Sequence, residues 1–137
     1  MNVNFEKNND VGLLILRVFV AGLMLFHGIA KVFHGVSFIE GQLTSVGLPA
    51  FIAYGVYIGE VIAPIAMIVG FRTRLASVIF AFTCVVAILL VHSVDIFSLN
   101  KHGGWAIELL ALYLFGSVAL FFTGAGKYAI SKVNQWD

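Results

Sequence analysis

The sequence has little charge for its length. Only 11% of its 137 residues are charged, whereas 61% are hydrophobic and the mean hydropathy is +1.01. Soluble domains carry charge on about a quarter of their residues, so a chain this short and apolar cannot cover its own surface in water. In lipid, apolar side chains face outward without that cost. A formal net charge of +1 also excludes the basic surface that nucleic-acid binding requires.

Cysteine is nearly absent too. Cys84 is the single cysteine, which excludes an intrachain disulfide and a cysteine-ligated metal site. Because Cys84 lies in an apolar run, we expect it to pack as a small hydrophobic residue. The sequence shows no nucleotide-binding motif, nucleophile triad or metal-ligand cluster, and it identifies no catalytic residue. Activity of the isolated chain as an enzyme is therefore not expected, although a role as a subunit of an enzyme stays open.

Apolar runs are what the chain has in abundance. About 20 apolar residues cross the hydrocarbon core of a bilayer as a helix. Four runs of this kind cover residues 11–32, 50–69, 75–94 and 105–122, and little chain remains between them. No linker, low-complexity segment or convincing internal repeat divides the sequence. We therefore predict an all-α fold, an integral membrane four-helix bundle formed by a single domain over residues 1–137.

The ends of the runs carry helix-capping signals. Gly70 follows the second run, where helices commonly end in a left-handed residue, and Thr73 stands at an N-cap position for the third. Ser37 and Glu40 have the spacing of a capping box, and apolar residues follow at helical intervals up to residue 46. These residues predict a short amphipathic helix at the outer membrane surface, between the first and second spans. The segment Gly124–Gly126 is expected to end the fourth helix.

Basic residues in the connections predict the orientation. With four spans, both termini and the 70–74 turn share one side of the membrane. That side holds five Lys and Arg residues and the other side holds two: Lys7, Arg72, Arg74, Lys127 and Lys132 against Lys31 and Lys101. The positive-inside rule therefore places both termini in the cytoplasm.

Several ionisable groups lie inside the predicted spans, where they are costly and usually face the bundle interior in pairs. Pro64, one turn after one of the acids, is expected to bend the second helix and open space beside that carboxylate. The intramembrane charged and polar cluster that we single out is Arg17, His27, Lys31, Glu60 and Glu108, with Tyr57 and His92 as secondary candidates.

Depth in the membrane predicts how these groups pair. At about 1.5 Å per residue, Arg17 and Glu60 differ in level by only about 6 Å, and Lys31 and Glu108 both lie within about 6 Å of the outer boundary. We therefore predict an Arg17–Glu60 pair and a Lys31–Glu108 pair, with His27 between the two levels. In the alternative, Lys31 and Glu108 are only helix-end charges that reach water, and the Arg17–Glu60 pair is purely structural.

The same residues belong to an ordered set of motifs. Along the chain stand Arg17 with residues 26–33 (FHGIAKVF), residues 47–49 (GLP), residues 59–60 (GE), the turn 70–74 (GFRTR) and the closing segment 124–128 (GAGKY). Over nearly the whole chain these motifs resemble those of the DoxX family, including its G-x-x-T-R turn and its closing G-P-G. Ala125 stands where the family usually has proline, and Ala129 and Ser131 stand where a serine and an aspartate often follow.

The resemblance implies a four-helix, multi-pass protein of the inner (cytoplasmic) membrane. The family takes its name from a subunit associated with a quinol-linked oxidase, and relatives have been linked to thiosulfate–quinone oxidoreduction and to membrane redox-stress complexes. The resemblance favours an accessory component of a membrane oxidoreductase, with quinone as the candidate cofactor. Its expected partners are other proteins of a redox complex in the lipid bilayer. The charged cluster would supply hydrogen-bond donors and a proton to the quinone. The alternatives are a non-enzymatic scaffold or chaperone-like partner and a small proton or solute pathway.

Overall fold

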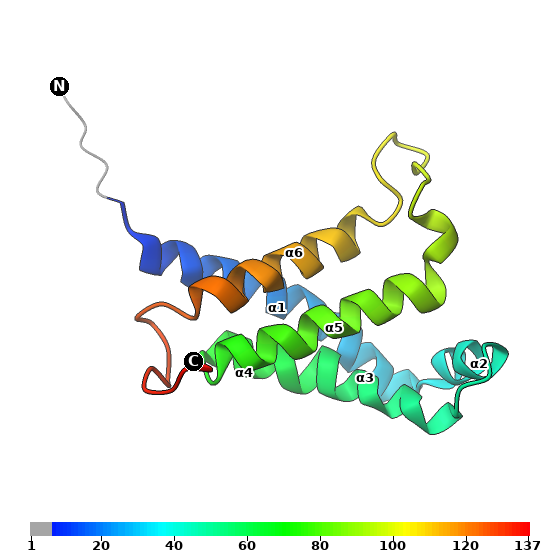
Figure 1. The fold of residues 1–137 in the computed structure, drawn as a ribbon, viewed down its shortest axis with the longest axis horizontal. Helices are drawn as coiled ribbons and strands as arrows, with labels where there is room; N and C mark the ends of the chain where they lie inside the picture. The colour runs from blue at the N-terminus through cyan, green and yellow to red at the C-terminus, as the bar shows by residue number, and fades with distance from the viewer. Residues whose placement is uncertain (1–6) are drawn as a thin grey trace.

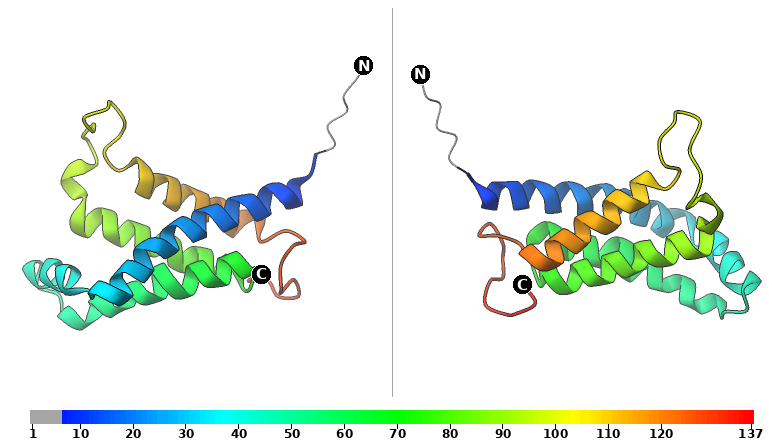
Figure 2. Two further views of the ribbon diagram at one scale, coloured as in Figure 1. Left: turned by 180° about the vertical axis from the view of Figure 1, so that it is seen from behind. Right: turned by 45° about the horizontal axis from the view of Figure 1, so that its top comes forward.

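Four long helical stretches run back and forth along the molecule (Figures 1 and 2). The computed structural model describes residues 7–137. The single α-helices are α1 (Asn9–His34), α2 (Ser37–Ser45), α5 (Thr73–Val91) and α6 (Glu108–Thr123), and η3 (Ser93–Asp95) is a 3₁₀ turn. The second stretch is composite and consists of η1 (Ala50–Tyr54), α3 (Gly55–Tyr57), η2 (Ile58–Ile62) and α4 (Ala63–Val69). Over the described residues the structure is helical and forms no strand, so the all-α prediction is confirmed.

Three of these stretches are long and apolar enough to cross a membrane, namely α1, the composite Ala50–Val69 and α5. The helix α6 has 16 residues and is shorter than a full span. Its predicted start at residue 105 was wrong, because Trp105 pairs with Leu99 and its indole N–H donates to the Ile96 carbonyl oxygen at 2.7 Å. The predicted end of the third span at residue 94 was also wrong. There the chain turns at His92, whose ring Nδ1 lies 3.1 Å from a carboxylate oxygen of Asp95.

The second stretch is not a regular α-helix, and its sequence explains why. Pro64 has no N–H, so it cannot donate to the carbonyl group of Glu60 four residues earlier. At this point the chain widens into the π segment η2, in which the N–H of Ala63 donates to the carbonyl oxygen of Ile58. Such segments are frequent at functional positions. A π segment that contains Glu60 therefore precedes Pro64, whereas the predicted bend and the open space beside the carboxylate stay predictions.

The bundle is apolar outside as well as inside. Large side chains such as Phe19, Phe26, Phe82 and Phe115 are mostly exposed. Lipid tails cover such side chains without the cost that water would impose, and close helix packing then depends on small residues in the interior. The core accordingly contains several small residues packed around Phe80, among them Ala21, Ala63, Ala76 and Cys84. The prediction that Cys84 packs as a small hydrophobic residue is confirmed, because it is fully buried.

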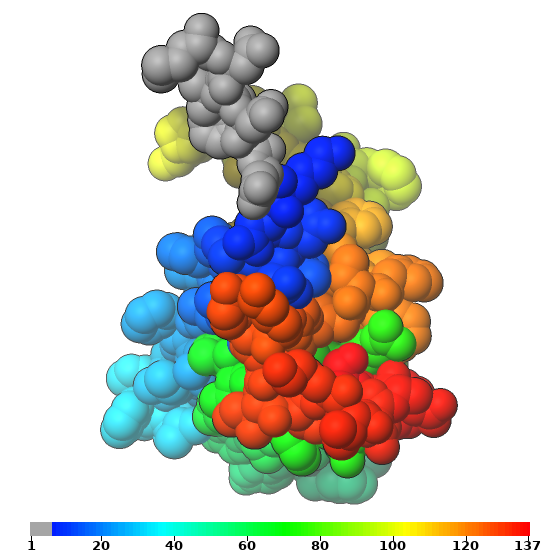
Figure 3. Space-filling model, turned by 90° about the vertical axis from the view of Figure 1, so that its left-hand side faces the viewer, coloured from blue at the N-terminus to red at the C-terminus, as the bar shows by residue number. Residues whose placement is uncertain are grey.

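One end of the bundle brings together the start of α1, the turn between α4 and α5, and residues 124–137, which we call the tail (Figures 1 and 3). As predicted, α4 ends at a left-handed Gly70, with φ of 75°, and α6 ends before Gly124. Thr73 is not the N-cap that we predicted, because it is already the first helical residue of α5. The tail supplies a cap instead: the carbonyl oxygen of Trp136 accepts from the N–H of Arg74 at 3.0 Å.

The opposite end carries α2 and the long loop between α5 and α6 (Figure 1). The predicted helix between the first two spans exists, but its capping box does not. Ser37 lies within the helix and makes no capping bond, since the N–H of Glu40 donates to the carbonyl oxygen of Val36. Burial of Val36 and Leu43 against Ala53 holds α2 to the start of the second stretch. Its orientation parallel to the membrane surface stays a prediction.

Candidate functional site

An ion pair between Lys31 and Glu60 forms the centre of the candidate site. The Nζ atom of Lys31 lies 2.5 Å from Oε2 of Glu60. Glu60, in η2, is only 7% exposed, whereas 28% of the Lys31 side chain near the end of α1 is exposed. The pair is thus buried on the carboxylate side and reachable on the ammonium side.

Both predicted pairings were therefore wrong. Glu60 pairs with Lys31 instead of Arg17, and Lys31 pairs with Glu60 instead of Glu108. Side chains on a helix tilt toward the N-terminus of that helix. The α1 helix and the second stretch are antiparallel (Figure 1). Lys31 therefore tilts toward the end of the bundle that carries the tail, Glu60 tilts toward the end that carries α2, and the two side chains meet. Counting residues to estimate depth ignored this tilt, which also directs Arg17 away from Glu60.

The backbone of α1 approaches Glu60 closely, and a glycine permits it. A Cβ atom added at Gly28 would lie 2.7 Å from the carbonyl carbon of Glu60 and closer still to the carbonyl oxygen. On the other side of η2, a Cβ at Gly59 would collide with the side chain of Thr83 on α5. The segment that carries Glu60 is therefore held between α1 and α5, which fixes the position of its carboxylate.

Two predicted residues, Tyr57 and His27, lie on or next to the elements that carry this pair, and a third residue, Tyr113, was not predicted. The Tyr57 hydroxyl donates to the carbonyl oxygen of Lys31 at 3.1 Å and so ties α3 to the end of α1. His27, one turn before Lys31 on α1, faces the ring of Tyr113 edge-on at 6.3 Å between centroids. Tyr113 is buried in α6 and also contacts Phe80. A polar aromatic residue in the middle of the fourth run was the available signal for it.

Arg17 occupies a separate place near the end of the bundle that carries the tail. Its side chain is 2% exposed, and its two terminal nitrogens donate to the carbonyl oxygens of Ala125, at 2.6 Å, and Tyr128. Among the described residues, no carboxylate lies within salt-bridge distance of this guanidinium. Its Nε atom, with the hydroxyls of Thr73 and Ser77, is buried without a hydrogen-bond partner. Arg17 therefore clamps the tail and is not part of the Lys31–Glu60 pair.

The remaining predicted residues lie away from the pair. Glu108 is exposed and is the first residue of α6, where a negative charge is favoured by the helix dipole. It fits the alternative of a helix-end charge. His92 lies at the end of α5 and contacts Asp95.

Sequence reasoning missed how firmly the tail is attached. Burial of the Asp137 carboxyl favours its neutral form, but hydrogen bonds from Ser131 and from the backbone N–H groups of Asn134 and Val133, together with Arg72, lower its pKa. The ionised carboxylate therefore joins residues within the tail through Ser131, and it joins the tail to the α4–α5 turn through Arg72. The C-terminal stretch mixes polar and apolar residues and gave no distinctive signal for these contacts.

The arrangement can hold and move a proton inside an apolar bundle. A lysine ammonium paired with a carboxylate offers a hydrogen-bond donor and a neighbouring base at the edge of the bundle. Tyr57 adds a hydroxyl beside it. Within residues 7–137, no group of three or more His, Cys, Asp or Glu side chains is placed to hold a metal ion.

Comparisons with known proteins agree with the motifs. Residues 12–93 match the family model described as DoxX. A Bacillus subtilis (strain 168) protein named "Putative oxidoreductase CatD" is 32% identical over 109 residues, which cover 80% of this chain and 81% of that protein. An uncharacterized protein of Haemophilus influenzae is 31% identical over 132 residues, which cover 94% and 95% of the two chains. No solved structure matches this chain. The resemblance seen in the motifs is confirmed, and the chain belongs to the DoxX family.

Proposed function

We propose that this protein is an accessory membrane component of an oxidoreductase system, and that a quinone headgroup meets it at the Lys31–Glu60 pair. The observation that carries the proposal is the pair itself, with 2.5 Å between Nζ and Oε2 in a segment with π geometry. Ionisable side chains inside a membrane bundle cost free energy, so their presence usually marks a functional site. The name of the Bacillus subtilis relative, which describes an oxidoreductase, supports the choice of redox chemistry.

The chemistry of a quinone suits such a pair. Reduction of a quinone to a quinol takes two electrons and two protons. The Lys31 ammonium can donate a hydrogen bond and then a proton to a carbonyl oxygen, while the Glu60 carboxylate stabilises the ammonium. A proton taken up from water restores the ammonium before the second proton is donated. Because Lys31 is partly exposed at the edge of α1, a ligand arriving through the lipid reaches it without entering the core. The electrons come from a partner protein, which makes this chain an accessory component.

We also propose a four-span, multi-pass topology in the inner membrane with both termini cytoplasmic. The start of α1, the α4–α5 turn and the tail gather at one end of the bundle, as four spans require (Figure 1). The 16 residues of α6 rise about 24 Å, somewhat less than a hydrocarbon core of about 30 Å. Apolar residues that flank α6, such as Trp105 and Tyr128, would cover the difference.

A scaffold role is the second candidate, and two observations favour it. Two surface hollows, one beside α4 and one beside the tail, are lined by other residues than Glu60 and Lys31. The two terminal nitrogens of Arg17 are occupied by tail carbonyls. In this role the charged groups specify helix packing, and the protein presents a fixed surface to a partner in the membrane.

Copurification separates the two candidates. The wild type, Glu60→Gln and Glu108→Gln are purified from native membranes, and quinone and partner subunits are counted per chain by mass spectrometry. Glu108 is the matched control because it is an exposed acid outside the pair. We expect quinone with the wild type and with Glu108→Gln, and much less with Glu60→Gln. Equal quinone in all three would contradict the quinone site, and partners without quinone in the wild type would favour the scaffold.

A further inference from the structure

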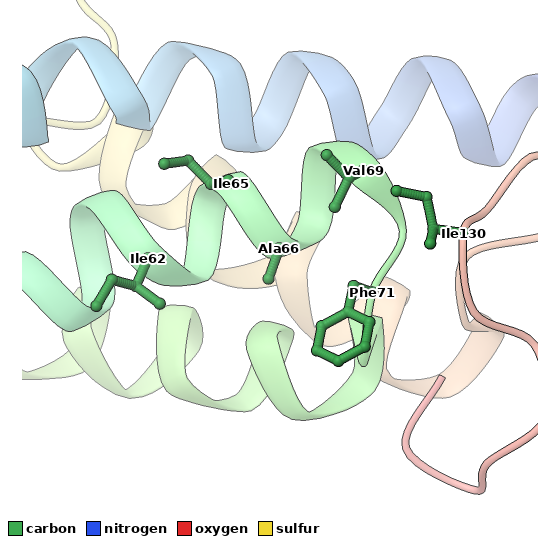
Figure 4. Close-up of a pocket in the computed structure, with 6 residues that line it drawn as sticks. All are labelled: Ile62, Ile65, Ala66, Val69, Phe71 and Ile130. Carbon is green, nitrogen blue, oxygen red and sulfur yellow. The ribbon is translucent and has the colours of Figure 1, made fainter.

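An apolar groove runs along the outside of α4 to the end of the bundle (Figure 4). It has a volume of about 450 Å³, and all six side chains that line it are apolar: Ile62, Ile65, Ala66, Val69, Phe71 and Ile130. From Ile62 to Val69 the helix rises about 10 Å. The groove therefore lies along a membrane-spanning segment, in the direction in which an acyl chain also lies.

The tail builds one wall of this groove and holds it in place. The N–H of Ile130 donates to the carbonyl oxygen of Val69 at 3.2 Å, and the N–H of Ser131 donates to that of Gly70 at 3.1 Å. In Figure 4, Ile130 reaches from the tail toward Val69, with Phe71 on the turn beside them. Ile130 is 74% exposed although its backbone is fixed. A fixed, exposed isoleucine at this position is suited to contact with a lipid chain.

A cation lies at the end of the groove where the spans stop. The guanidinium carbon of Arg72 lies 5.5 Å from the centroid of the Phe71 ring, which lines the groove. Arg72 keeps 35% of its side chain exposed, and its contact with Asp137 is long, at 3.4 Å. A turn between two membrane spans lies at the level of the lipid headgroups, where Lys and Arg attract anionic lipids.

The surrounding charges reinforce this field. Besides the buried Arg17, the described residues at this end of the bundle include five basic side chains and two acidic ones: Lys7, Arg72, Arg74, Lys127 and Lys132 against Asp10 and Asp137. Asp10 accepts from the backbone N–H of Lys127, and Asp137 is used within the tail and by Arg72. The excess of positive charge favours an anionic headgroup over a zwitterionic one.

We propose that the groove is a binding site for one anionic phospholipid, with an acyl chain along α4 and the phosphate on Arg72. Apolar contact along the groove retains the chain, and Arg72 selects the headgroup. The site is independent of the Lys31–Glu60 pair and of the proposed redox function. Its occupant stabilises the tail, because Ile130 lies between lipid and the end of α4.

Native mass spectrometry of the full chain in detergent tests the site, with phosphatidylglycerol or phosphatidylcholine of identical acyl chains as the added probe. We expect one phosphatidylglycerol to be retained in preference to phosphatidylcholine. Arg72→Gln should reduce phosphatidylglycerol retention about fivefold, the effect of one cation near the membrane surface, and should lower phosphatidylcholine retention less, because choline already balances the charge of its phosphate. Lys101→Gln, in the loop at the opposite end, is the matched control and should change neither.

A groove-filling variant tests the apolar part. Ile65→Trp should lower retention of both lipids, whereas Ile15→Trp, on an equally exposed apolar position of α1, should not. The four substituted positions are at least partly exposed, so the variants should fold, and thermal denaturation checks this; they are Arg72, Lys101, Ile65 and Ile15. Equal retention of the two lipids by the wild type, or an unchanged preference in Arg72→Gln, would overturn the proposal. A dimer that Ile65→Trp abolishes would overturn it in favour of self-association through the same groove.

Discussion

Arg17 allows a direct test of how the tail is held. Its buried guanidinium donates to the carbonyl oxygens of Ala125 and Tyr128. A hydrogen bond from a charged donor contributes about 1.5–3 kcal/mol, so the two together hold the tail by at most about 3–6 kcal/mol. Relief of the desolvation of the guanidinium offsets part of this value when the charge is removed. We expect Arg17→Gln to weaken tail attachment by at least about 1.4 kcal/mol, which is tenfold in the opening equilibrium.

Amide hydrogen exchange in detergent measures this opening. The N–H groups of Ile130 and Ser131 bond to the end of α4, so their exchange should become at least about tenfold faster in Arg17→Gln. The control is Arg74→Gln, because the Arg74 side chain makes one long contact, at 3.4 Å, with the carbonyl oxygen of Gln135. Unchanged exchange in the tail together with faster exchange in η2 would refute the clamp and restore the Arg17–Glu60 pairing.

Three further predictions concern packing, pH and topology. Gly28→Ala should lower the free energy of unfolding by about 1–3 kcal/mol, because its methyl group meets the Glu60 carbonyl. Gly22→Ala is the control, since its methyl group enters open space and should not destabilise the protein. Thermal denaturation compares the two variants, and equal effects would argue against the close approach. The lowered pKa of Asp137 means that its contribution to tail attachment is fully present above the ordinary value of 3.8 and is lost as the pH falls below it. Tail proteolysis should therefore rise in acid more in the wild type than in Asp137→Asn, and identical acid profiles would count against this role. A reporter that is active only outside the cytoplasm should give signal when fused at Gly103 and none at Asp137, and the reverse result would invert the topology.

The helical framework follows from local and periodic features of the sequence. Bilayer thickness sets the length of an apolar run, so three of the four runs correspond to helices of span length. Gly70 acts through its own backbone conformation, so the end of α4 was predictable, whereas the π segment before Pro64 was not. The boundary at Trp105 was not, because the loop that holds this residue depends on pairing with Leu99 and on a bond to Ile96.

The pairing of charges depends on features that residue counting omits. Depth along the helix placed Arg17 near Glu60, but the opposite tilt of side chains on antiparallel helices brings Lys31 to Glu60. The actual partners of Arg17 are backbone carbonyls more than 100 residues away, at Ala125 and Tyr128. Every residue has a carbonyl group, so no side-chain pattern marks the ones that fold back. Arg17 and Glu60 were predictable as ionisable residues of the bundle interior, whereas their contacts required the folded chain.

A double-mutant cycle on Lys31 and Glu60 tests the central claim most directly. The unfolding free energy in detergent is measured for Glu60→Gln, Lys31→Gln and the double variant, and for the matched cycle of Glu60→Gln with Arg17→Gln. We predict a coupling of about 1–2 kcal/mol between Lys31 and Glu60, below the value for a fully buried pair because Lys31 is partly exposed. We expect additivity within about 0.5 kcal/mol for Arg17 and Glu60. Additive effects for Lys31 with Glu60, or clear coupling of Arg17 with Glu60, would contradict the pairing.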